Sequence, residues 1–271
     1  MKPISIITGG GSGMGLATAK VLGMSDYIII VGRTQKKLTN ALQELQQMGI
    51  EAETFACDIS DRNSVNKLFA HAKRIGKIRS VIHAAGMSPN MGDAKTIMEV
   101  NALGTININN ACFEALENGA CIVDVSSMAG NIAPQIILPR LSYKYSHIDT
   151  KKFMRKMMRR VNLFPKKLKS EVAYAISKNF VTWFALSDAA RFGAKGIRVV
   201  CVSPGMFDTP MGALEQEEAE KYIRKYAAVK RMGDVDEIAN LLAFCVSDKT
   251  PYLTGVDIIC DGGCIAGRKV K

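Results

Sequence analysis

The chain has 271 residues, of which 48% are hydrophobic and 23% charged, and its formal net charge is +11. This length and composition predict a globular fold with a sizeable core and argue against an intrinsically disordered chain. The charge is concentrated, because residues 140–169 contain eleven Lys or Arg and one acid, Asp149. The excess charge therefore belongs to one segment, and it does not indicate a nucleic-acid-binding fold as a whole.

The seven cysteines are scattered along the chain, with no C-x-x-C pair and no neighbouring pair of histidines. We therefore expect free thiols in a reducing, cytoplasmic compartment and no metal site. An apolar strand is expected from Ile4 onward, which leaves no room for a targeting segment ahead of it. No apolar run approaches the length of a membrane-spanning helix.

Short apolar runs rich in β-branched residues alternate with segments of helical period. The expected strands are 4–8, 27–31, 52–57, 80–84, 121–126, 197–203 and 256–260. Amphipathic helical patterns lie between the early strands, as at 35–48 and 61–75. This alternation predicts an α/β fold: one doubly wound parallel sheet, a Rossmann fold, with helices on both faces. We expect a single domain over residues 1–271, with an insertion at residues 131–170 that fits neither a strand nor a crossover helix.

The first turn, TGGGSGMG at residues 8–15, directly follows an apolar strand and precedes a helical pattern. Glycine permits the tight turn, and the free backbone N–H groups at the start of a helix can bind a pyrophosphate. A glycine-rich turn alone is weak evidence. In this position within a β-α-β unit, however, it predicts dinucleotide binding.

The second strand ends in VGRT, which contains Arg33 and Thr34 and no acid. An acid at this point would bind the adenosine ribose and favour NAD. The Arg33 guanidinium can instead pair with a 2′-phosphate, and Thr34 can add a hydroxyl. The sequence therefore favours NADP(H), with NAD(H) possible if Arg33 only stacks on adenine or faces solvent.

Tyr174 and Lys178, in YAISK, are four residues apart and would share one face of a helix. A lysine beside a tyrosine hydroxyl favours the phenolate, so the tyrosine can donate and accept a proton near neutral pH. Ser126 and Ser127 end the fifth expected strand, at the sheet edge where ligands bind in α/β folds. A hydrolase triad is not indicated, since G-x-S-x-G is absent. His83, at the end of an apolar strand, is interpreted as a core residue.

Taken in order, these motifs resemble the short-chain dehydrogenase/reductase family over nearly the whole chain outside the insertion. Asn101, in VNALGT, and Ser127, Tyr174 and Lys178 match the catalytic tetrad of that family. The resemblance implies that Asn101 supports a proton relay through water to Lys178. It also implies a set of cofactor-binding residues, which are Gly9, Ser12, Gly13, Met14, Gly15, Arg33, Thr34, Asp58, Ile59, Ala84, Ala85, Gly86, Tyr174, Lys178, Gly205, Met206 and Thr209.

Within that set, Asp58 in CDI would contact adenine, and Thr209 in SPGMFDTPM would hold the nicotinamide carboxamide. The chain also departs from the family pattern. HAAG (83–86) stands where N-N-A-G is usual, and Asp124 and Val200 stand where asparagines are common. Ser127 and Tyr174 are forty-seven residues apart, which is far more than the usual spacing.

The extra residues contain KKFMRKMMRR, at 151–160, in which apolar and basic side chains recur on opposite faces of a helix. Four interpretations stay open: a packed helix with a solvated basic face, either alone or as part of a subunit interface; a lid over the substrate; a membrane-surface helix; or a nucleic-acid site. The first two are favoured, because the segment lacks tryptophan and no nucleic-acid motif accompanies the charge. A long insertion at this position also resembles the 3-alpha-hydroxysteroid dehydrogenase/carbonyl reductase branch of the family.

We therefore expect an NADP(H)-dependent enzyme that interconverts a secondary alcohol and a ketone, on a bulky apolar substrate such as a hydroxysteroid or bile acid. The alternatives are an NAD-dependent reductase of small carbonyl or acyl-thioester substrates, and a non-catalytic protein that senses NADP(H). The family resemblance implies a homo-oligomer, either a dimer or a tetramer.

Overall fold

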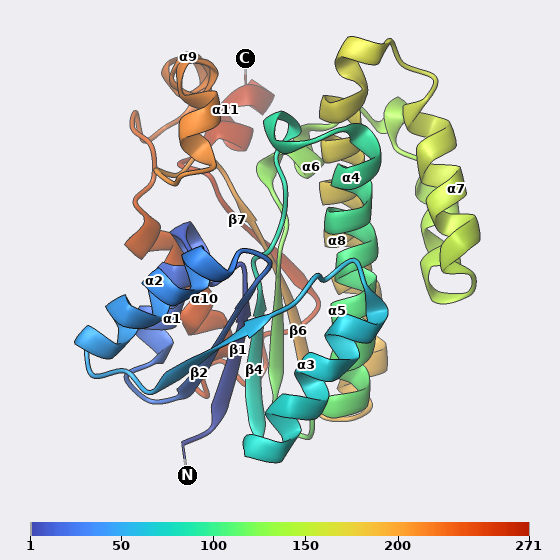
Figure 1. Ribbon diagram of the computed structural model, residues 1–271. Coiled ribbons are helices and arrows are strands. Elements are labelled where there is room, and N and C mark those ends of the chain that lie inside the picture. The colour runs from blue at the N-terminus through green and yellow to red at the C-terminus, as the bar shows by residue number, and fades with distance from the viewer. Residues whose placement is uncertain (1, 271) are drawn as a thin grey trace.

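The structure, a computed structural model, describes residues 2–270 apart from the side chain of Glu215. In this part of the chain seven parallel strands form one sheet, in the order β3-β2-β1-β4-β5-β6-β7 (Figure 1). The strands are β1 (Ile4–Thr8), β2 (Tyr27–Gly32), β3 (Ala52–Ala56), β4 (Ile78–His83), β5 (Cys121–Val125), β6 (Arg198–Pro204) and β7 (Val256–Cys260). The predicted strands are confirmed, with ends that differ by at most two residues.

The α-helices are α1 (Gly13–Leu22), α2 (Gln35–Gln47), α3 (Arg62–Ile75), α4 (Ala94–Met98), α5 (Gly104–Ala115), α6 (Met128–Ile132), α7 (Thr150–Val161), α8 (Lys169–Gly193), α9 (Gln216–Tyr226), α10 (Val235–Val246) and α11 (Cys264–Val270). A π-helical turn, η2 (Glu99–Leu103), joins α4 to α5. Helices α1, α2 and α10 cover one face of the sheet, and α3, α5 and α8 cover the other (Figure 1). The predicted single-domain Rossmann architecture is confirmed.

Alternating side chains of each central strand divide the core into two layers. In β2, Ile28 and Ile30 pack in the layer beneath α1, α2 and α10, whereas Ile29 and Val31 pack in the layer beneath α3, α5 and α8. All four are fully buried. Successive side chains of a strand point to opposite faces, so a strand covered on both sides must be apolar throughout. This requirement explains why the strands could be recognised as continuous apolar runs.

Residues 131–170 form a separate helical layer outside α8. The segment contains a 3₁₀ stretch, η4 (Arg140–His147), followed by α7, which packs against η4, α4 and α8 (Figure 1). Tyr143 and Phe153 are fully buried, and their rings lie 5.4 and 4.5 Å from the ring of Phe180 in α8. The tyrosine hydroxyl also donates to Asn179 Oδ1 at 3.1 Å. The insertion is thus anchored on the outer side of α8.

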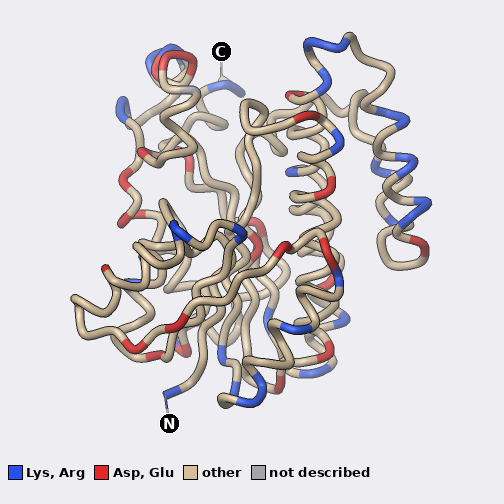
Figure 2. Tube along the Cα trace, in the orientation of Figure 1, with Lys and Arg blue, Asp and Glu red and all other residues tan. Residues whose placement is uncertain are grey.

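The polarity predicted for α7 is confirmed in its main features. Phe153, Met157 and Val161 are fully buried, whereas Met154 and Met158 are only partly buried. Lys and Arg positions recur along α7 and in the segment above it, as Figure 2 shows, and Lys151, Arg155 and Arg159 are exposed. Among the described residues, no helix is long and apolar enough to cross a membrane.

Candidate active site

The candidate site is a cavity of about 510 Å³ at the carboxyl edge of the sheet. Residues at or just after the ends of β1, β2, β4, β5 and β6 line it, which is the position of ligand sites in open α/β folds. The expected cofactor residues that line the cavity are Gly9, Ser12, Gly13, Met14, Gly15, Arg33, Ile59, Ala84, Ala85, Gly86, Tyr174, Lys178, Gly205, Met206 and Thr209. The fold therefore brings together residues from both halves of the chain.

The glycine turn after β1 leaves an open cradle at the start of α1. Gly9 and Gly13 have φ angles of 71° and 54°, in the left-handed region that side chains disfavour. A Cβ on Gly15 would lie 2.5 Å from the Gly9 carbonyl oxygen, so the two chain segments touch here without room for a side chain. Ser12 caps α1 without a side-chain hydrogen bond, and the first turn carries no acid. Free N–H groups at a helix start without an acid fit the pyrophosphate of a dinucleotide.

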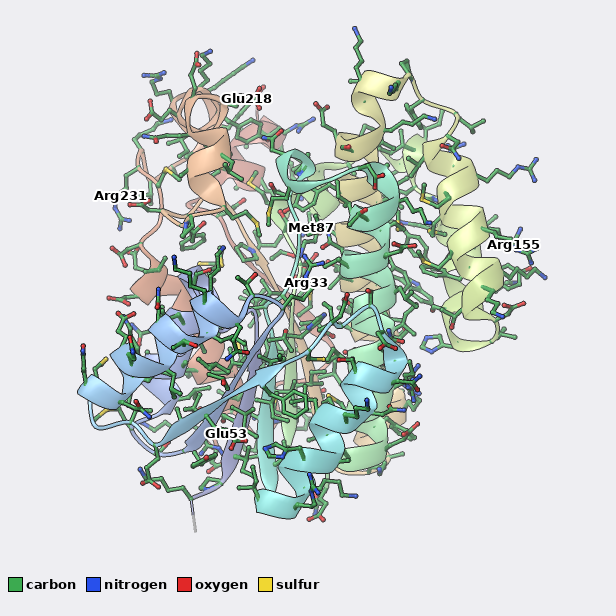
Figure 3. The ribbon with its side chains drawn as sticks, in the orientation of Figure 1. Arg33, Glu53, Met87, Arg155, Glu218 and Arg231 are labelled. Carbon is green, nitrogen blue, oxygen red and sulfur yellow. The ribbon has the colours of Figure 1, made fainter. Side chains whose placement is uncertain are left out.

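The adenosine end of the cavity contains one cation and no carboxylate from β2. Arg33 is exposed, with Nη2 4.0 Å from Met87 Sδ, and the two side chains meet near the centre of the molecule in Figure 3. Thr34, the N-cap residue of α2, does not line the cavity. Asp58 does not line it either. Its Oδ1 accepts from the backbone N–H of Ser60 at 2.9 Å and from the Ser60 hydroxyl at 2.7 Å.

Ser127, Tyr174 and Lys178 all line the cavity. Ser127 caps α6, where its Oγ accepts from Ala129 N at 3.2 Å. Tyr174 and Lys178 lie one turn apart in α8, as predicted. Lys178 is buried, and its ammonium donates to the Val125 carbonyl oxygen at 2.9 Å. Burial lowers the pKa of Lys178 to about 8, against a smaller opposing effect of Cys201 and Asp124.

Asn101 lies behind the residues that line the cavity and does not line it itself. Its side chain is buried, with Oδ1 accepting from Met87 N at 2.8 Å and Nδ2 donating to Met87 O at 3.0 Å. Nδ2 also lies 3.1 Å from Ser177 Oγ, so the amide ties the loop after β4 to α8. A Cβ on Gly86 would lie 3.3 Å from both Asn101 Oδ1 and Lys178 Nζ. The residue is therefore close to Lys178, but the structure gives it a positioning contact and no cavity surface.

His83 is confirmed as a core residue. It is buried, its Nδ1 lies 2.8 Å from Thr8 Oγ1, and its Nε2 lies 3.0 Å from Thr105 Oγ1. Burial, helped by the nearby Lys178 charge, lowers the pKa of His83 to about 3. The imidazole is therefore neutral at physiological pH and holds β1, β4 and α5 together.

A buried polar cluster lies beneath the lysine, between β5, α5 and α8. Asp124 is fully buried, and its Oδ2 accepts from Asn109 Nδ2 at 2.8 Å. In the described structure Asp124 Oδ1, Asn109 Oδ1 and Asp188 Oδ1 have no hydrogen-bond partner. Burial raises the pKa of Asp124 to about 7; Asp188 raises it further, while Asn109 and Lys178 oppose the shift. The cluster thus has more acceptors than donors, which a proton on Asp124 would relieve.

The far wall of the cavity was not predicted from the sequence. Seven of the described lining residues are methionines: Met14, Met87, Met91, Met128, Met206, Met211 and Met232. Phe207, Tyr222 and Ile132 add further apolar surface, and Glu218 is the one carboxylate among the described lining residues. Two of these methionines, Met14 in TGGGSGMG and Met206 in SPGM, are among the predicted cofactor-binding residues, whereas α9 has an ordinary amphipathic pattern that did not point to the cavity.

Of the insertion, only Ile132 at its start contributes to the cavity. Ile132 and Tyr174 line it, whereas none of residues 133–173 does. Helix α7 therefore does not cover the cavity in this structure, because its apolar face packs on α8 and α4, and a role of the insertion as a substrate lid stays a prediction.

Comparison with known proteins agrees with this geometry. Residues 3–162 match the family described as short chain dehydrogenase, and residues 165–264 match the one described as Enoyl-(Acyl carrier protein) reductase. The chain belongs to the short-chain dehydrogenase/reductase family. This dehydrogenase is 27% identical to Short-chain dehydrogenase/reductase bsc3 of Alternaria brassicicola, over 98% of this chain and 97% of that one. It is 25% identical to the A-factor type gamma-butyrolactone 1'-reductase (1S-forming) of Streptomyces virginiae, over 96% and 94%.

Solved structures share the fold of the dehydrogenase. Actinorhodin polyketide ketoreductase with NADPH aligns with a TM-score of 0.77 and 20% identity, over 97% of both chains. A short chain dehydrogenase from Burkholderia cenocepacia in complex with NADP aligns with a TM-score of 0.77 and 21% identity, over 97% of this chain and 98% of that one. The particular likeness to the 3-alpha-hydroxysteroid dehydrogenase/carbonyl reductase branch stays a prediction.

The buried Asp124 makes the stability of the dehydrogenase depend on pH. Because its folded pKa, about 7, lies above the ordinary value, its contribution to stability is present below about pH 4 and is lost as the pH rises through 7. The full shift corresponds to on the order of 4 kcal/mol. Asp124→Asn keeps the size and shape of the side chain. Its amide NH2 group can donate a hydrogen bond at any pH, whereas the carboxyl group can donate only when it is protonated. We expect this variant to gain several degrees in unfolding midpoint over wild type at pH 8 and little at pH 4.

The measurement is thermal unfolding of both proteins across this pH range, with Asp149→Asn as a control. Asp149 is exposed, and it caps α7 through Lys152 N, a bond that an asparagine side chain can also accept. An equal change in the Asp124→Asn midpoint at pH 4 and pH 8 would contradict the assignment of the proton to Asp124.

Proposed function

We propose that the protein is an NADP(H)-dependent oxidoreductase that interconverts a secondary alcohol and a ketone. The observation that carries the proposal is the convergence of Ser127, Tyr174 and Lys178 on the cavity that also contains the glycine turn. Lys178 is buried behind this group, and Ser127 is the N-cap residue of α6, so both side chains are held in fixed positions at the cavity. The family membership independently supports a dehydrogenase or reductase.

Each polar residue of the group has a distinct role. Tyr174 donates a proton to the substrate oxygen in reduction and accepts it in oxidation. Ser127 donates a hydrogen bond to the same oxygen and so holds it in place. The buried Lys178 ammonium, held by the Val125 carbonyl, favours the phenolate of Tyr174 and provides a nearby donor for ribose hydroxyls. A bound nicotinamide dinucleotide would supply or accept the hydride.

Lys178 also limits the useful pH range of the reaction. With a pKa of about 8, its ammonium is charged at neutral pH and loses its proton a little above it. Asn101 acts through position, because its amide holds the Met87 backbone beside Lys178. The relay through water implied by the family resemblance is retained as part of the proposal.

Arg33 supports a preference for NADP(H). It lies at the cavity rim just after β2, where no carboxylate is available to bind ribose hydroxyls. A guanidinium pairs with a phosphate through two charged hydrogen bonds. Thr34 lies outside the lining residues, so Arg33 is the group to which we assign recognition of the 2′-phosphate. NAD(H) is the alternative cofactor.

The remaining wall favours a bulky apolar substrate, as expected for a hydroxysteroid. Methionine side chains are flexible and polarizable, so a wall rich in them adapts to a large hydrophobic ligand. Glu218 adds a negative charge at the mouth of this wall, and Figure 3 shows it above Met87 on α9. A substrate whose distal end is neutral would fit better than a free acid or an acyl thioester of an anionic carrier.

Replacing Tyr174 by phenylalanine tests the catalytic assignment. Tyr174→Phe keeps the ring but removes the proton, so we expect turnover to fall by at least 100-fold, on the scale of general acid–base catalysis. NADPH binding, followed by fluorescence titration, should change little. Turnover near the wild-type rate would contradict the proposal, whereas loss of NADPH binding would point to a structural role of the hydroxyl.

Replacing Arg33 tests the cofactor preference. Arg33→Ala removes a charged pair with the 2′-phosphate, which NADH lacks, and we expect NADPH affinity to fall roughly 10- to 100-fold with NADH affinity little changed. Lys37→Ala, an exposed cation in the first turns of α2, is the matched control. Equal weakening of both cofactors would show that Arg33 contacts adenine alone.

Glu218→Gln tests the substrate class. At an exposed site, removing one repulsive charge should raise kcat/KM about two- to five-fold for a ketone bearing a carboxylate, and leave its neutral methyl ester unchanged. Glu220→Gln on the same helix, which does not line the cavity, is the control. An equal response of acid and ester would remove Glu218 from substrate selection.

A further inference from the structure

The outer surface of residues 140–169 carries positive charge that the protein does not neutralise. In the described structure, none of its eleven Lys and Arg side chains lies within 4 Å of a carboxylate. Helix α9 shows the ordinary solvated pattern, in which both signs are mixed and Lys221 pairs with Glu217 at 2.5 Å. Helix α7 contains six cations and no acid. Charges of one sign that lie close together repel one another and so destabilise the helix. A helix face that only needs to be soluble can avoid this repulsion by mixing both signs.

The cations are crowded as well as unpaired. Lys144, Lys152 and Lys156 have their ammonium groups 5.9, 4.3 and 5.2 Å from the centre of the Tyr145 ring. Arg160 is bound to the carbonyl oxygens of Ile136 and Ile137, which fixes the start of the insertion against α7. The positive charge therefore lies on a segment that is folded and bound to its neighbours, not on an extended tail.

Exposed aliphatic side chains flank the cations on the same segment. Leu141, Ile148 and Leu163 are 91, 76 and 69% exposed. Lys151, Arg155 and Arg159 are exposed at intervals of four residues along α7, with Ile148 just before the helix and Leu163 just after it. We call this set, Ile148, Lys151, Arg155, Arg159 and Leu163, the basic surface. It combines a cationic centre with apolar ends.

From this combination we propose that the basic surface docks on the anionic face of a phospholipid membrane. Clustered Lys and Arg attract anionic headgroups, and aliphatic side chains at the rim add contact with the acyl boundary. The apolar face of α7 is itself buried, so the helix would lie on the membrane and not insert into it. A second copy of this surface would repel the first.

A nucleic acid is the less favoured partner. Exposed leucine and isoleucine gain nothing from a phosphate backbone, and stacking on bases needs free aromatic rings. Of the tyrosines in the segment, Tyr143 is buried and Tyr145 is surrounded by three lysines. The sequence alone disfavoured a membrane because tryptophan is absent. The structure changes this balance, because α7 does not line the cavity and aliphatic side chains are exposed beside its cations.

Vesicle co-sedimentation of the full chain tests the proposal. We expect binding to phosphatidylcholine vesicles that contain phosphatidylserine, no binding to phosphatidylcholine alone, and release at high salt. Lys151→Gln, Arg155→Gln and Arg159→Gln together should weaken binding on the order of 100-fold, at roughly five-fold per charge. The matched control is Lys67→Gln, Lys73→Gln and Arg74→Gln on α3, which removes three exposed cations elsewhere and should bind like wild type. Equal loss in both triple variants, or no dependence on phosphatidylserine, would overturn the proposal.

Replacing the exposed aliphatic residues at the two ends of the basic surface distinguishes a membrane from other anionic partners. Ile148→Ser with Leu163→Ser should weaken vesicle binding several-fold and leave unchanged any binding to heparin, a polyanion that offers no apolar contact. Duplex DNA that binds more tightly than the vesicles, with no effect of these two changes, would assign the surface to nucleic acid instead. Unfolding midpoints and NADPH affinity check that every variant is folded, and both should stay at wild-type values because the altered side chains are exposed and outside the cavity.

Discussion

The burial of Lys178 is the constraint on which the rest of the site depends. A charged ammonium inside the protein is stable only if nearby groups compensate for the lost water. Here the Val125 carbonyl accepts a hydrogen bond from it, and Asp124 lies close enough to favour the charge. Its position therefore requires β5, α8 and the loop after β4 to meet at one point, and this meeting also defines the back of the cavity.

The contacts around that point explain why several residues are polar although they do not touch the cavity. Asn101 holds Met87 with both ends of its amide, and the π-helical turn η2 carries it at the required position. His83 fills a similar role between Thr8 and Thr105. Buried polar groups need partners, so these residues form connected pairs. The cluster around Asp124 is an exception in the described structure, since three of its oxygen atoms lack donors.

The insertion has an apolar side that packs on the protein and a charged side that is exposed to solvent. Its apolar side packs on α8 and α4, and α8 carries Tyr174 and Lys178, while its cations are exposed or partly exposed and line no part of the cavity. The walls next to the glycine turn and the catalytic residues follow the general pattern of the family. The methionine-rich wall and the basic surface are the features on which the proposed substrate class and the proposed membrane contact rest.

The sequence by itself determined the sheet, the glycine turn and the residues Ser127, Tyr174 and Lys178. Each depends on local periodicity or on close spacing along the chain: apolar runs form strands, and residues four apart share a helix face. The tertiary structure alone decided the placement of Thr34, Asp58 and Asn101 outside the cavity, the far wall with Glu218, and the outward position of α7. These outcomes depend on which surfaces of distant segments pack together. An amphipathic pattern predicts that a helix buries one face, but it does not predict which part of the protein that face packs against.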